Sequence, residues 1–381
     1  MERRELLLDV FPLLVAISGI ARFVRELADA LGSRPDAPPA RFVYPAHLRN
    51  GARPPYAAER LRPLPITGWA MLALLRASAN WGLRPDRLYG RPAVVHSPMG
   101  YGPIFGGARL LLTIHDLMFL HHPEWHGRGT VSLLGSTVPK AARHATLITC
   151  DSEFVRGQVA QLPGVDPSRV VTVHPAVPSS FGPQPVDEAR RYAVERFGLD
   201  GDFILHVGTV VPRKNHVRVV EAFERLRRAG FAGRLVLVGQ DDRRSESIDA
   251  RLASSPQSGS IVRVRDATDP DLVALYNACT MFVFPSLEEG FGYPLVEAMA
   301  CGAACITSNR SSLVEVAGDG AVQVTPEDTE ELAEAMIELW RDPDLRSVLG
   351  ARGRAQAAHF SQDRWIGRMF EIYRSLLSGA G

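Results

Sequence analysis

One polar, glycine-containing segment combines an anion-binding pattern with two carboxylates, and it reads Glu288-Glu289-Gly290-Phe291-Gly292-Tyr293-Pro294-Leu295-Val296-Glu297. Pro294 suits the first turn of a helix, where a backbone N–H would have no partner in any case. The free N–H groups and the dipole of such a turn bind anions. Glu289 and Glu297 would oppose an anion unless they bound something else, and the vicinal hydroxyls of a sugar or a ribose fit carboxylates. We therefore predict a site for a phosphorylated sugar; the alternative is a helix-entry loop with surface acids.

A second segment offers positive charge at the end of a predicted buried strand, Phe203–Val207. The strand is followed by Gly208, which lets the backbone approach a ligand closely. Arg213 and Lys214 come next, and a guanidinium fork beside an ammonium suits a diphosphate. Lys214 is one of only two lysines among 43 lysines and arginines. The alternative is a solvated pair of cations before a helix. A second strand-then-glycine pattern ends at Gly239 and is weaker, because many α/β proteins have it.

In the first half of the chain, His115 ends the apolar run Leu110–His115 and precedes Asp116. A histidine at a strand end beside a carboxylate is a candidate for the reacting centre, with a satisfied core histidine as the alternative. Nearby, His122 and His126 have the i, i+4 spacing of metal ligands on a helix. The proline between them argues against a helix there, so we predict no metal site.

Composition disfavours several classes of function. The 381 residues carry a net charge of +1, so no global field points to nucleic acid. The chain lacks the G-x-G-x-x-G and Walker A patterns of dinucleotide and P-loop sites. The four cysteines lie in apolar runs without the partners of a zinc site, which fits a reduced, cytoplasmic setting. The apolar run near the N-terminus is interrupted by Asp9 and Pro12, and it is too short and broken for a membrane span.

Short apolar runs alternate with helical periodicity, which predicts α/β domains built on parallel sheets covered on both faces. A proline-rich stretch near residues 175–188 separates two such series. We therefore predict two Rossmann-like, doubly wound domains at residues 1–180 and 188–360, and a C-terminal helix at 361–381 that crosses back to the first. Ligands of such sheets bind at the carboxyl ends of the strands. The predicted strands are Leu6–Leu14, Ala93–His96, Leu110–His115, Thr146–Cys150, Val170–Val173, Phe203–Val207, Leu235–Val238, Ile261–Val264, Met281–Phe284, Ala304–Thr307 and Ala321–Val324.

Together these segments resemble the retaining glycosyltransferases of family 4, and the resemblance covers most of the chain. Residues 288–297 resemble the E-x7-E region of that family, and residues 208–215 resemble its diphosphate-binding segment. Ser18-Gly19-Ile20-Ala21-Arg22 resembles its glycine loop, with Ser18 where a second glycine is common. Residues 113–117, 150–154 and 308–319 resemble further segments of the family. The resemblance implies the GT-B fold, in which an acceptor-binding first domain and a donor-binding second domain face a central cleft. It also implies an enzyme that needs no metal or other cofactor.

The resemblance assigns roles to individual residues. Arg213 and Lys214 would hold the donor diphosphate, while Glu297 would hold the ribose hydroxyls. Glu289 would hold the transferred sugar, and His115 would lie beside it, so these two are the candidate catalytic residues. The other donor-binding residues would be Gly19 by the phosphates, Asp266 near the base, Leu295 near the nucleotide, and Gly208, Thr209, Gly239, Gly290, Phe291 and Gly292. No nucleophile is evident, so departure guided by the phosphate on the front face is favoured over a covalent intermediate.

The resemblance leaves the donor and the acceptor open. GDP-mannose is the first expectation, because the Glu-Gly-Phe-Gly-Tyr-Pro sequence resembles mannosyltransferases of polysaccharide assembly; a UDP-sugar is the alternative. A phosphorylase, an epimerase and a non-catalytic nucleotide-sugar-binding subunit remain as rivals. The acceptor would belong to a polysaccharide, a glycolipid or a metabolite. Residues 41–110 hold ten arginines against Glu59 and Asp86, with Trp69 and Trp81 among them. This region would touch an anionic membrane surface or a phosphorylated lipid acceptor; codon bias toward arginine is the alternative.

Overall fold

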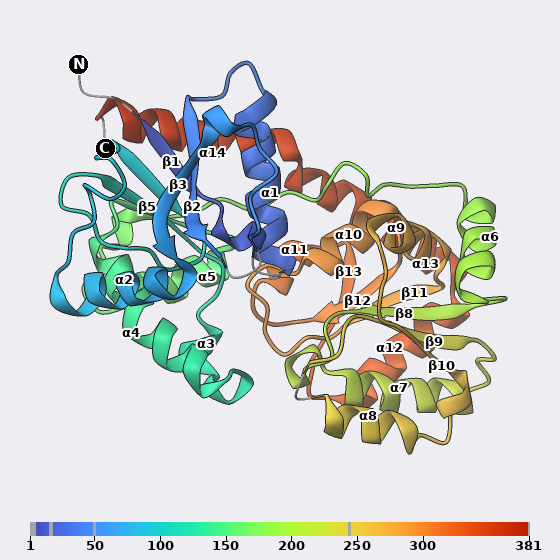
Figure 1. The fold of residues 1–381 in the computed structure, drawn as a ribbon. Coiled ribbons are helices and arrows are strands. Elements are labelled where there is room, and N and C mark those ends of the chain that lie inside the picture. The colour runs from blue at the N-terminus through green and yellow to red at the C-terminus, as the bar shows by residue number, and fades with distance from the viewer. Residues whose placement is uncertain (1–4, 15–17, 49–50, 243–244, 380–381) are drawn as a thin grey trace. The chain divides into compact units, whose positions relative to one another are not determined.

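The computed structural model describes residues 5–14, 18–48, 51–242 and 245–379. The chain divides into two compact units, one formed by Met1–Pro175 with Asp363–Gly381 and the other by Ala176–Gln362. Each unit has its own parallel sheet (Figure 1). Parallel strands need long crossover connections, which explains why strand and helix patterns alternate in the sequence.

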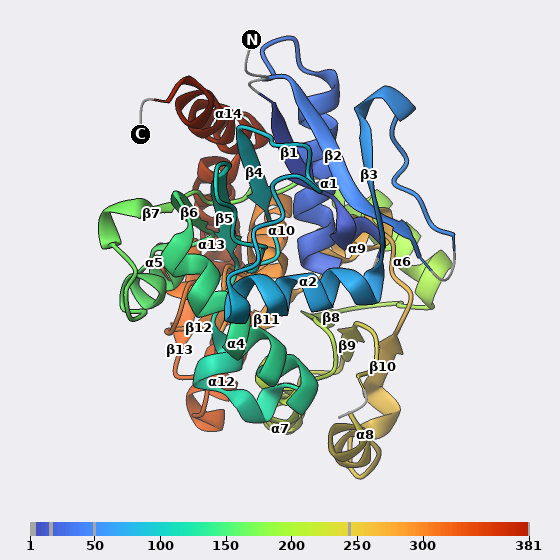
Figure 2. The ribbon, with the colours of Figure 1, turned by 60° about the vertical axis from the view of Figure 1, so that its left-hand side comes forward.

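The first unit contains a seven-stranded sheet in the order β3-β2-β1-β4-β5-β6-β7. Its strands are β1 (Leu6–Asp9), β2 (Ala40–His47), β3 (Leu61–Thr67), β4 (Val94–Ser97), β5 (Arg109–Ile114), β6 (Leu147–Cys150) and β7 (Val170–Thr172). Its helices are α1 (Ser18–Ser33), α2 (Gly68–Trp81), α3 (Met118–His121), α4 (Arg128–His144), α5 (Glu153–Ala160) and α14 (Gln362–Ser378). Alternate residues of β4 show how the two faces are covered. Val95 packs in a cluster with Met71 of α2, while His96 on the other face lies 2.7 Å from the Tyr373 hydroxyl of α14. Both helices lie beside the strands of this sheet in Figure 2.

Two parts of this unit differ from the sequence prediction. The predicted strand Leu6–Leu14 is too long, because β1 ends at Asp9 and Phe11–Leu14 forms a 3-10 turn. The Asp9 carboxylate accepts a hydrogen bond from the Phe11 N–H at 2.9 Å, which turns the chain. Strands β2 and β3 are absent from the prediction. The prolines of β3 hide it as a strand, and they are tolerated because β3 lies at the sheet edge, where one row of N–H groups has no partner.

A buried chain of hydrogen bonds ties helix α14 to the middle of the first sheet. His96 Nδ1 lies 2.7 Å from the Tyr373 hydroxyl, and His96 Nε2 lies 2.7 Å from Thr113 Oγ1. Thr113 Oγ1 in turn lies 2.7 Å from Thr149 Oγ1. Burial lowers the pKa of His96 to about 3, so its ring is neutral and can donate at one nitrogen and accept at the other. The chain links β4, β5 and β6 near the edge where His115 lies.

The second unit contains a six-stranded parallel sheet in the order β10-β9-β8-β11-β12-β13. Its strands are β8 (Phe203–Val207), β9 (Arg234–Val238), β10 (Ile261–Val264), β11 (Met281–Phe284), β12 (Cys305–Ser308) and β13 (Ala321–Val324). Its helices are α6 (Val186–Phe197), α7 (His216–Arg228), α8 (Glu246–Ala253), α9 (Asp269–Ala278), α10 (Tyr293–Cys301), α11 (Leu313–Ala317), α12 (Thr329–Arg341) and α13 (Pro343–Ala357). The strand order reverses between β8 and β11. In open α/β sheets, ligands bind outside the carboxyl ends of the strands at such a reversal.

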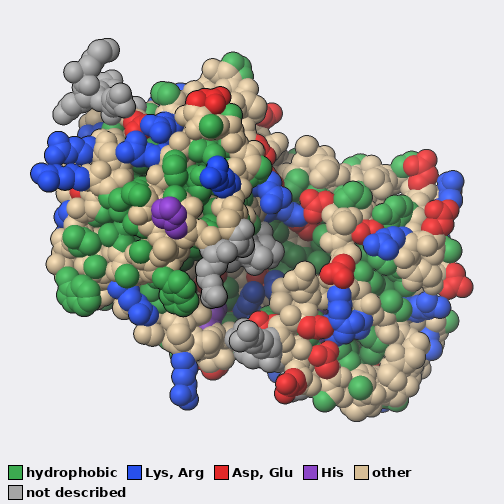
Figure 3. All heavy atoms as spheres, viewed as in Figure 1, with side chains coloured by type: hydrophobic (Ala, Val, Ile, Leu, Met, Phe, Trp, Pro, Cys, Tyr) green, Lys and Arg blue, Asp and Glu red, His purple; other side chains and the backbone are tan. Residues whose placement is uncertain are grey.

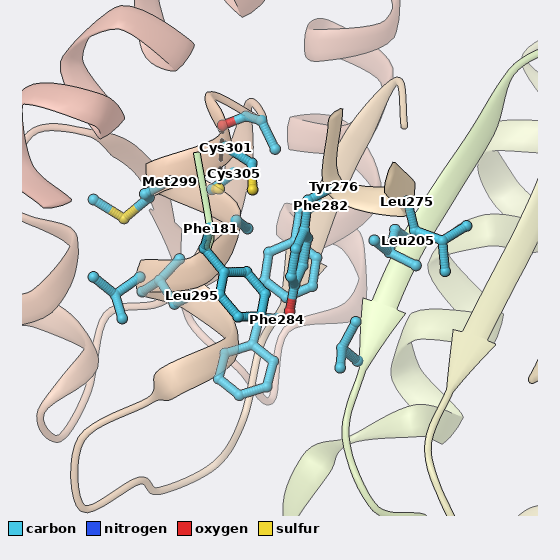
Figure 4. Packing of buried hydrophobic residues seen from close by; sticks show 14 of the residues in the cluster. Phe181, Leu205, Leu275, Tyr276, Phe282, Phe284, Leu295, Met299, Cys301 and Cys305 are labelled. Carbon is cyan, nitrogen blue, oxygen red and sulfur yellow. Dashed lines mark hydrogen bonds between the residues drawn. The ribbon is translucent and has the colours of Figure 1, made fainter. Parts of the chain in front are cut away.

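The core of the second unit lies on both faces of its sheet. Along β11, Phe282 and Phe284 pack into one cluster with side chains of α9 and α10, while Met281 and Val283 pack into another with α7 and α12. The rings of Phe282 and Phe284 stack at 5.7 Å, and Tyr276 meets Phe282 edge-on (Figure 4). A sheet covered on both faces favours apolar residues at successive strand positions, which explains the uninterrupted apolar run at β11 and the nearly continuous one at β8. The one polar residue of β8, His206, is buried, and its Nδ1 lies 2.8 Å from the Val283 carbonyl oxygen.

Candidate functional site

The two segments singled out by their chemistry follow the two strands at the reversal of the second sheet. β8 and β11 pair in parallel, with Ile204 opposite Met281, so the segments after them start at the same edge. Hydrogen bonds join the segments directly. The Leu287 N–H donates to the Arg213 carbonyl at 2.9 Å, and Asn215 Nδ2 donates to the Pro285 carbonyl at 2.9 Å. The structure therefore brings the predicted diphosphate segment and the glutamate segment together.

The centre of this site is a buried cluster of Arg213, Lys214 and Glu289. Lys214 Nζ donates to Glu289 Oε1 at 2.6 Å, and Arg213 Nη1 lies 2.6 Å from Glu289 Oε2. Arg213 Nη1 also donates to the Glu288 carbonyl at 2.9 Å, and Lys214 Nζ lies 4.6 Å from the centre of the Phe284 ring. Only 8% of Lys214 and 6% of Glu289 are exposed. These are not the solvated loop cations that the sequence left as an alternative.

Burial and pairing act on these charges in opposite directions. Burial lowers the pKa of Lys214 to about 8, although the charge of Glu289 works against that change. Burial alone would raise the pKa of Glu289, but the charges of Arg213 and Lys214 outweigh it and lower that pKa to about 2. Glu289 is therefore ionised at neutral pH and acts as a hydrogen-bond acceptor, not as an acid.

The backbone around Glu289 is held from the segment before α11. The Glu289 N–H donates to Ser311 Oγ at 3.1 Å, and Ser312 Oγ lies 2.8 and 2.9 Å from the carbonyls of Glu289 and Phe291. Gly292 then takes a φ of 106°, and a Cβ there would lie 2.6 Å from Leu313 Cδ2. Only glycine fits this position. The Gly290–Gly292 turn thus has one fixed course into helix α10.

Helix α10 supplies the predicted anion-binding N-terminus and carries the second glutamate. Gly292 is its N-cap without a side-chain hydrogen bond, and a proline occupies its first turn. Glu297 lies one turn inside, 3% exposed, and its Oε2 accepts a hydrogen bond from the Tyr276 hydroxyl at 3.1 Å. The Leu295 side chain is wholly buried in the core, so only its backbone can reach a ligand (Figure 4).

The remaining predicted donor residues fall into two groups. Gly208 and Gly239 touch each other, since a Cβ on Gly239 would lie 2.1 Å from the Gly208 carbonyl oxygen. Thr209 follows them and is exposed at the same edge. Asp266 is exposed beyond β10, which β9 separates from β8, so the structure does not bring it into the cluster.

In the first unit, His115 lies at the carboxyl end of β5 and is held by two acceptors. Its Nδ1 lies 2.6 Å from Asp151 Oδ2, and its Nε2 lies 2.7 Å from the Pro98 carbonyl oxygen. Burial lowers the pKa of His115, but the charge and hydrogen bond of Asp151 and the bond to Pro98 outweigh it, so the net change is upward. Two acceptors on one ring need two N–H groups, which favours the imidazolium form.

Phe23 of α1 meets the His115 ring edge-on, with centroids 5.0 Å apart. Helix α1 begins at Ser18, so Gly19 lies in the first turn of the helix whose Phe23 contacts His115. Asp151 was not among the predicted site residues. Asp151 directly follows β6, which pairs with β5 so that Cys150 lies opposite Ile114. Only the strand order therefore shows that Asp151 and His115 are neighbours.

The first unit also contains an apolar cavity of about 800 Å³ at the carboxyl ends of β2, β3 and β4. Its apolar lining comes from Phe11, Leu48, Trp69, Leu72, Met99 and Tyr101. Trp69 and Trp81, in the first and last turns of α2, are 74% and 83% exposed. Trp69 lines this cavity, and an exposed tryptophan beside an apolar hollow is typical of binding surfaces.

Several of the ten arginines of residues 41–110 serve the fold. Arg41 and Arg62 pair with Glu5 at 3.1 and 3.9 Å. Arg60 donates to the Leu31 carbonyl at 3.0 Å, and Arg109 donates to the Leu376 carbonyl. On the face in Figure 3, blue side chains are still more prominent than red on the left, where the first unit lies. The charge left for an anionic partner is smaller than the composition suggests.

The described part of the chain shows neither a metal-binding cluster nor a membrane-spanning helix. No group of three or more His, Cys, Asp or Glu side chains there is arranged to hold a metal ion. The ring of His122 stacks on Trp125 at 3.9 Å instead. None of the helices in the described ranges is both long and apolar enough to cross a bilayer.

Comparison with known proteins identifies both units. The family described as "Glycosyl transferases group 1" matches residues 190–356, and "Glycosyltransferase Family 4" matches residues 17–181. The O-antigen chain mannosyltransferase B of Escherichia coli is 29% identical over 322 residues, which cover 83% of this chain and 82% of that protein. A D-inositol 3-phosphate glycosyltransferase of Frankia alni is 31% identical over 315 residues, which cover 80% of this chain and 73% of that protein.

The fold has close counterparts among solved structures. Sucrose-phosphate synthase from Thermosynechococcus elongatus matches with a TM-score of 0.78 at 19% identity, over 99% of this chain and 100% of that one. At this identity the likeness concerns the fold alone, and the fold is GT-B. Together with the two family matches, it shows that the chain is an enzyme that belongs to glycosyltransferase family 4.

Proposed function

We propose that the protein transfers a hexose from a nucleoside diphosphate sugar to an acceptor hydroxyl, with retention of the anomeric configuration. The observation that carries this proposal is the buried cluster of Arg213, Lys214 and Glu289 beside the N-terminus of α10. Two cations and a helix N-terminus suit a diphosphate. A buried carboxylate next to them suits the hydroxyls of the sugar, and Glu297 one turn further suits those of the ribose.

The proposed reaction moves one bond and one proton. The bond between the anomeric carbon and the diphosphate oxygen breaks, and Arg213, Lys214 and the first turn of α10 stabilise the negative charge that grows on the leaving diphosphate. The acceptor oxygen bonds to the anomeric carbon on the face that the diphosphate leaves. The acceptor proton passes to a diphosphate oxygen, so neither Glu289 nor Glu297 acts as an acid or base.

For the first unit, the roles of His115 beside the reacting sugar and of Gly19 by the phosphates remain proposals. The contacts of His115 with Asp151 and Pro98 support a fixed positive charge at this position, because a ring that donates from both nitrogens cannot take up a proton. We therefore assign His115 an electrostatic role and not that of a general base.

We propose GDP-mannose as the first donor to test, because a mannosyltransferase is among the relatives that match most of the chain. A UDP-sugar is the alternative. The test is to incubate the protein with GDP- and UDP-sugars and candidate acceptors, and to compare the wild type with Lys214→Met and Glu297→Ala. Transfer from one donor that falls by at least about 100-fold in both variants supports the proposal. Wild-type turnover in both variants would show that the site lies elsewhere.

A non-catalytic nucleotide-sugar-binding subunit is the second alternative, and it predicts donor binding without transfer to any acceptor.

For the acceptor, the apolar cavity beside Trp69 favours a molecule with an apolar part, such as a glycolipid or a lipid-linked saccharide of polysaccharide assembly. Peripheral contact with the cytoplasmic face of a membrane would bring such an acceptor to the enzyme. Sedimentation with anionic vesicles, compared between the wild type and Trp69→Ala/Trp81→Ala, tests that contact. Equal sedimentation of both proteins would contradict it.

A further inference from the structure

The two cations that suit a diphosphate are already paired with a carboxylate of the same site. Both oxygens of Glu289 lie 2.6 Å from a cationic nitrogen, one from Lys214 and the other from Arg213. All three side chains are mostly buried, with side-chain exposures of 8%, 10% and 20% for Glu289, Lys214 and Arg213. Any phosphate oxygen that binds these nitrogens must therefore share them with Glu289 or displace it.

The backbone of Glu289 is anchored, which limits how far its carboxylate can move from the two cations. Its backbone N–H is bonded to Ser311 Oγ, and its carbonyl lies 2.8 Å from Ser312 Oγ. The turn that follows is fixed by the positive φ of Gly292 and by its contact with Leu313. A carboxylate anchored in this way stays within a few ångströms of the cations and of whatever anion they bind. Like charges at such a separation repel strongly in a partly desolvated site.

We propose that Glu289 makes the site favour the intact nucleotide sugar over the nucleoside diphosphate product. This inference rests on the proposed function of the site. In the intact donor, sugar hydroxyls donate hydrogen bonds to the carboxylate and offset its repulsion of the diphosphate. After transfer the sugar is gone, and the carboxylate again competes with the diphosphate for Lys214 and Arg213. Glu289 then has two roles. It contacts the donor sugar, and it determines specificity because it weakens binding of the product.

This proposal predicts an unusual result, in which removing a charge from the binding site improves binding. In Glu289→Gln, GDP or UDP, whichever the wild type binds, should bind about tenfold more tightly. The corresponding nucleotide sugar, measured without acceptor, should gain nothing or bind more weakly. Product inhibition should become stronger while turnover falls. Titration calorimetry with the nucleoside diphosphate and with the nucleotide sugar measures both affinities, and their ratio is the quantity that tests the proposal.

Glu288→Gln is the matched control, because it removes the same charge from the adjacent residue, whose backbone carbonyl accepts from Arg213 and is kept in the variant. It should leave the ratio of the two affinities near the wild-type value. In Lys214→Met, adding Glu289→Gln should improve diphosphate binding by a smaller factor than in the wild type, because Glu289 then competes with the diphosphate for Arg213 alone. If Glu288→Gln and Glu289→Gln both strengthened diphosphate binding by the same factor, the cause would be a general effect of negative charge, and this result would overturn the proposal.

Weaker or unchanged diphosphate binding by a folded Glu289→Gln would also overturn it. If that variant does not fold, the wild type alone decides, since the proposal requires it to bind the nucleotide sugar more tightly than the diphosphate. The reverse order contradicts the proposal. A wild type that binds neither GDP nor UDP nor their sugars contradicts the proposed function itself, and this outcome is distinct from an altered ratio.

Discussion

At the scale of residues, the proposed donor site depends on how its charged side chains pair, with Glu289 bound to both Arg213 and Lys214. The sequence indicates the types and places of Arg213, Lys214, Glu289 and Glu297, because cations after one strand and acids after another suit a sugar diphosphate. It does not indicate that Glu289 binds both cations, since that pairing depends on β8 and β11 being neighbours. Asp151 is missed for the same reason, because the sequence does not reveal which strands are neighbours. Asp151 lies beside His115 only because β6 pairs with β5.

The pairing of His115 with Asp151 predicts a pH effect. The pKa of His115 is raised above 6.5 in the folded protein, so its protonated form stabilises the fold. This contribution is complete below the unfolded pKa and is lost as the pH rises through the raised folded value. Asp151→Asn keeps an acceptor for Nδ1 but removes the charge. The pKa of His115 should fall, and the free energy of unfolding should drop by about 1–3 kcal/mol at acidic to neutral pH, with a smaller loss at alkaline pH.

Titration of the His115 ring protons by NMR and denaturant unfolding from about pH 5 to about pH 9 measure both effects. Asp116→Asn is the control, because Asp116 contributes the smallest of the causes that raise the pKa of His115. A His115 pKa that is unchanged in Asp151→Asn would contradict the assignment of Asp151 as the residue that holds the imidazolium.

At the scale of elements, the sequence indicates the second unit better than the first. β8, β10, β11 and β13 lie where the apolar runs predict them, because strands covered on both faces are mostly apolar. Single polar residues, His206, Arg263 and Gln323, do not break the pattern in β8, β10 and β13. β2 and β3 are missed because prolines interrupt them, and α8 because it has only eight residues, Glu246–Ala253, of which half are polar. No apolar run encodes the strand order. That order places the proposed donor site at the reversal between β8 and β11.

The turn into α10 gives a prediction at this scale. Gly292→Ala must adopt a φ near 106° and meet Leu313 Cδ2, so we expect a loss of about 1–3 kcal/mol in the free energy of unfolding and lower affinity for the donor. Gly259→Ala in the same unit is the control, because a Cβ there meets nothing within 4 Å. Denaturant unfolding and donor titration give the two readouts. Wild-type stability and affinity in Gly292→Ala would show that the turn is not required.

At the scale of the whole molecule, the chain consists of two units with separate sheets and separate cores. The family matches follow the same division, with one family description for residues 17–181 and the other for residues 190–356. The acceptor and donor roles of the two units remain predictions. What the structure adds is that each unit has its own set of polar groups at the carboxyl edge of its sheet.

This organisation predicts where a nucleoside diphosphate protects the backbone. In hydrogen exchange on the full chain, binding of GDP or UDP should slow exchange most in residues 208–215 and 285–297, because these segments form the proposed site. The edge strand Leu61–Thr67 of the first unit should exchange as before. Protection confined to the first unit would contradict the assignment of the donor site to residues 176–362.

The central claim is that Lys214 and its neighbours bind the diphosphate of the donor, and calorimetry with GDP and UDP tests it most directly. The chain offers a matched control, since its other lysine, Lys140, lies in the first unit and donates to Asn80. We predict that the wild type and Lys140→Met bind one of the two nucleotides with equal affinity, and that Lys214→Met binds it at least about tenfold more weakly. Equal affinity in Lys214→Met and the wild type, or no binding of either nucleotide by the wild type, would contradict the account.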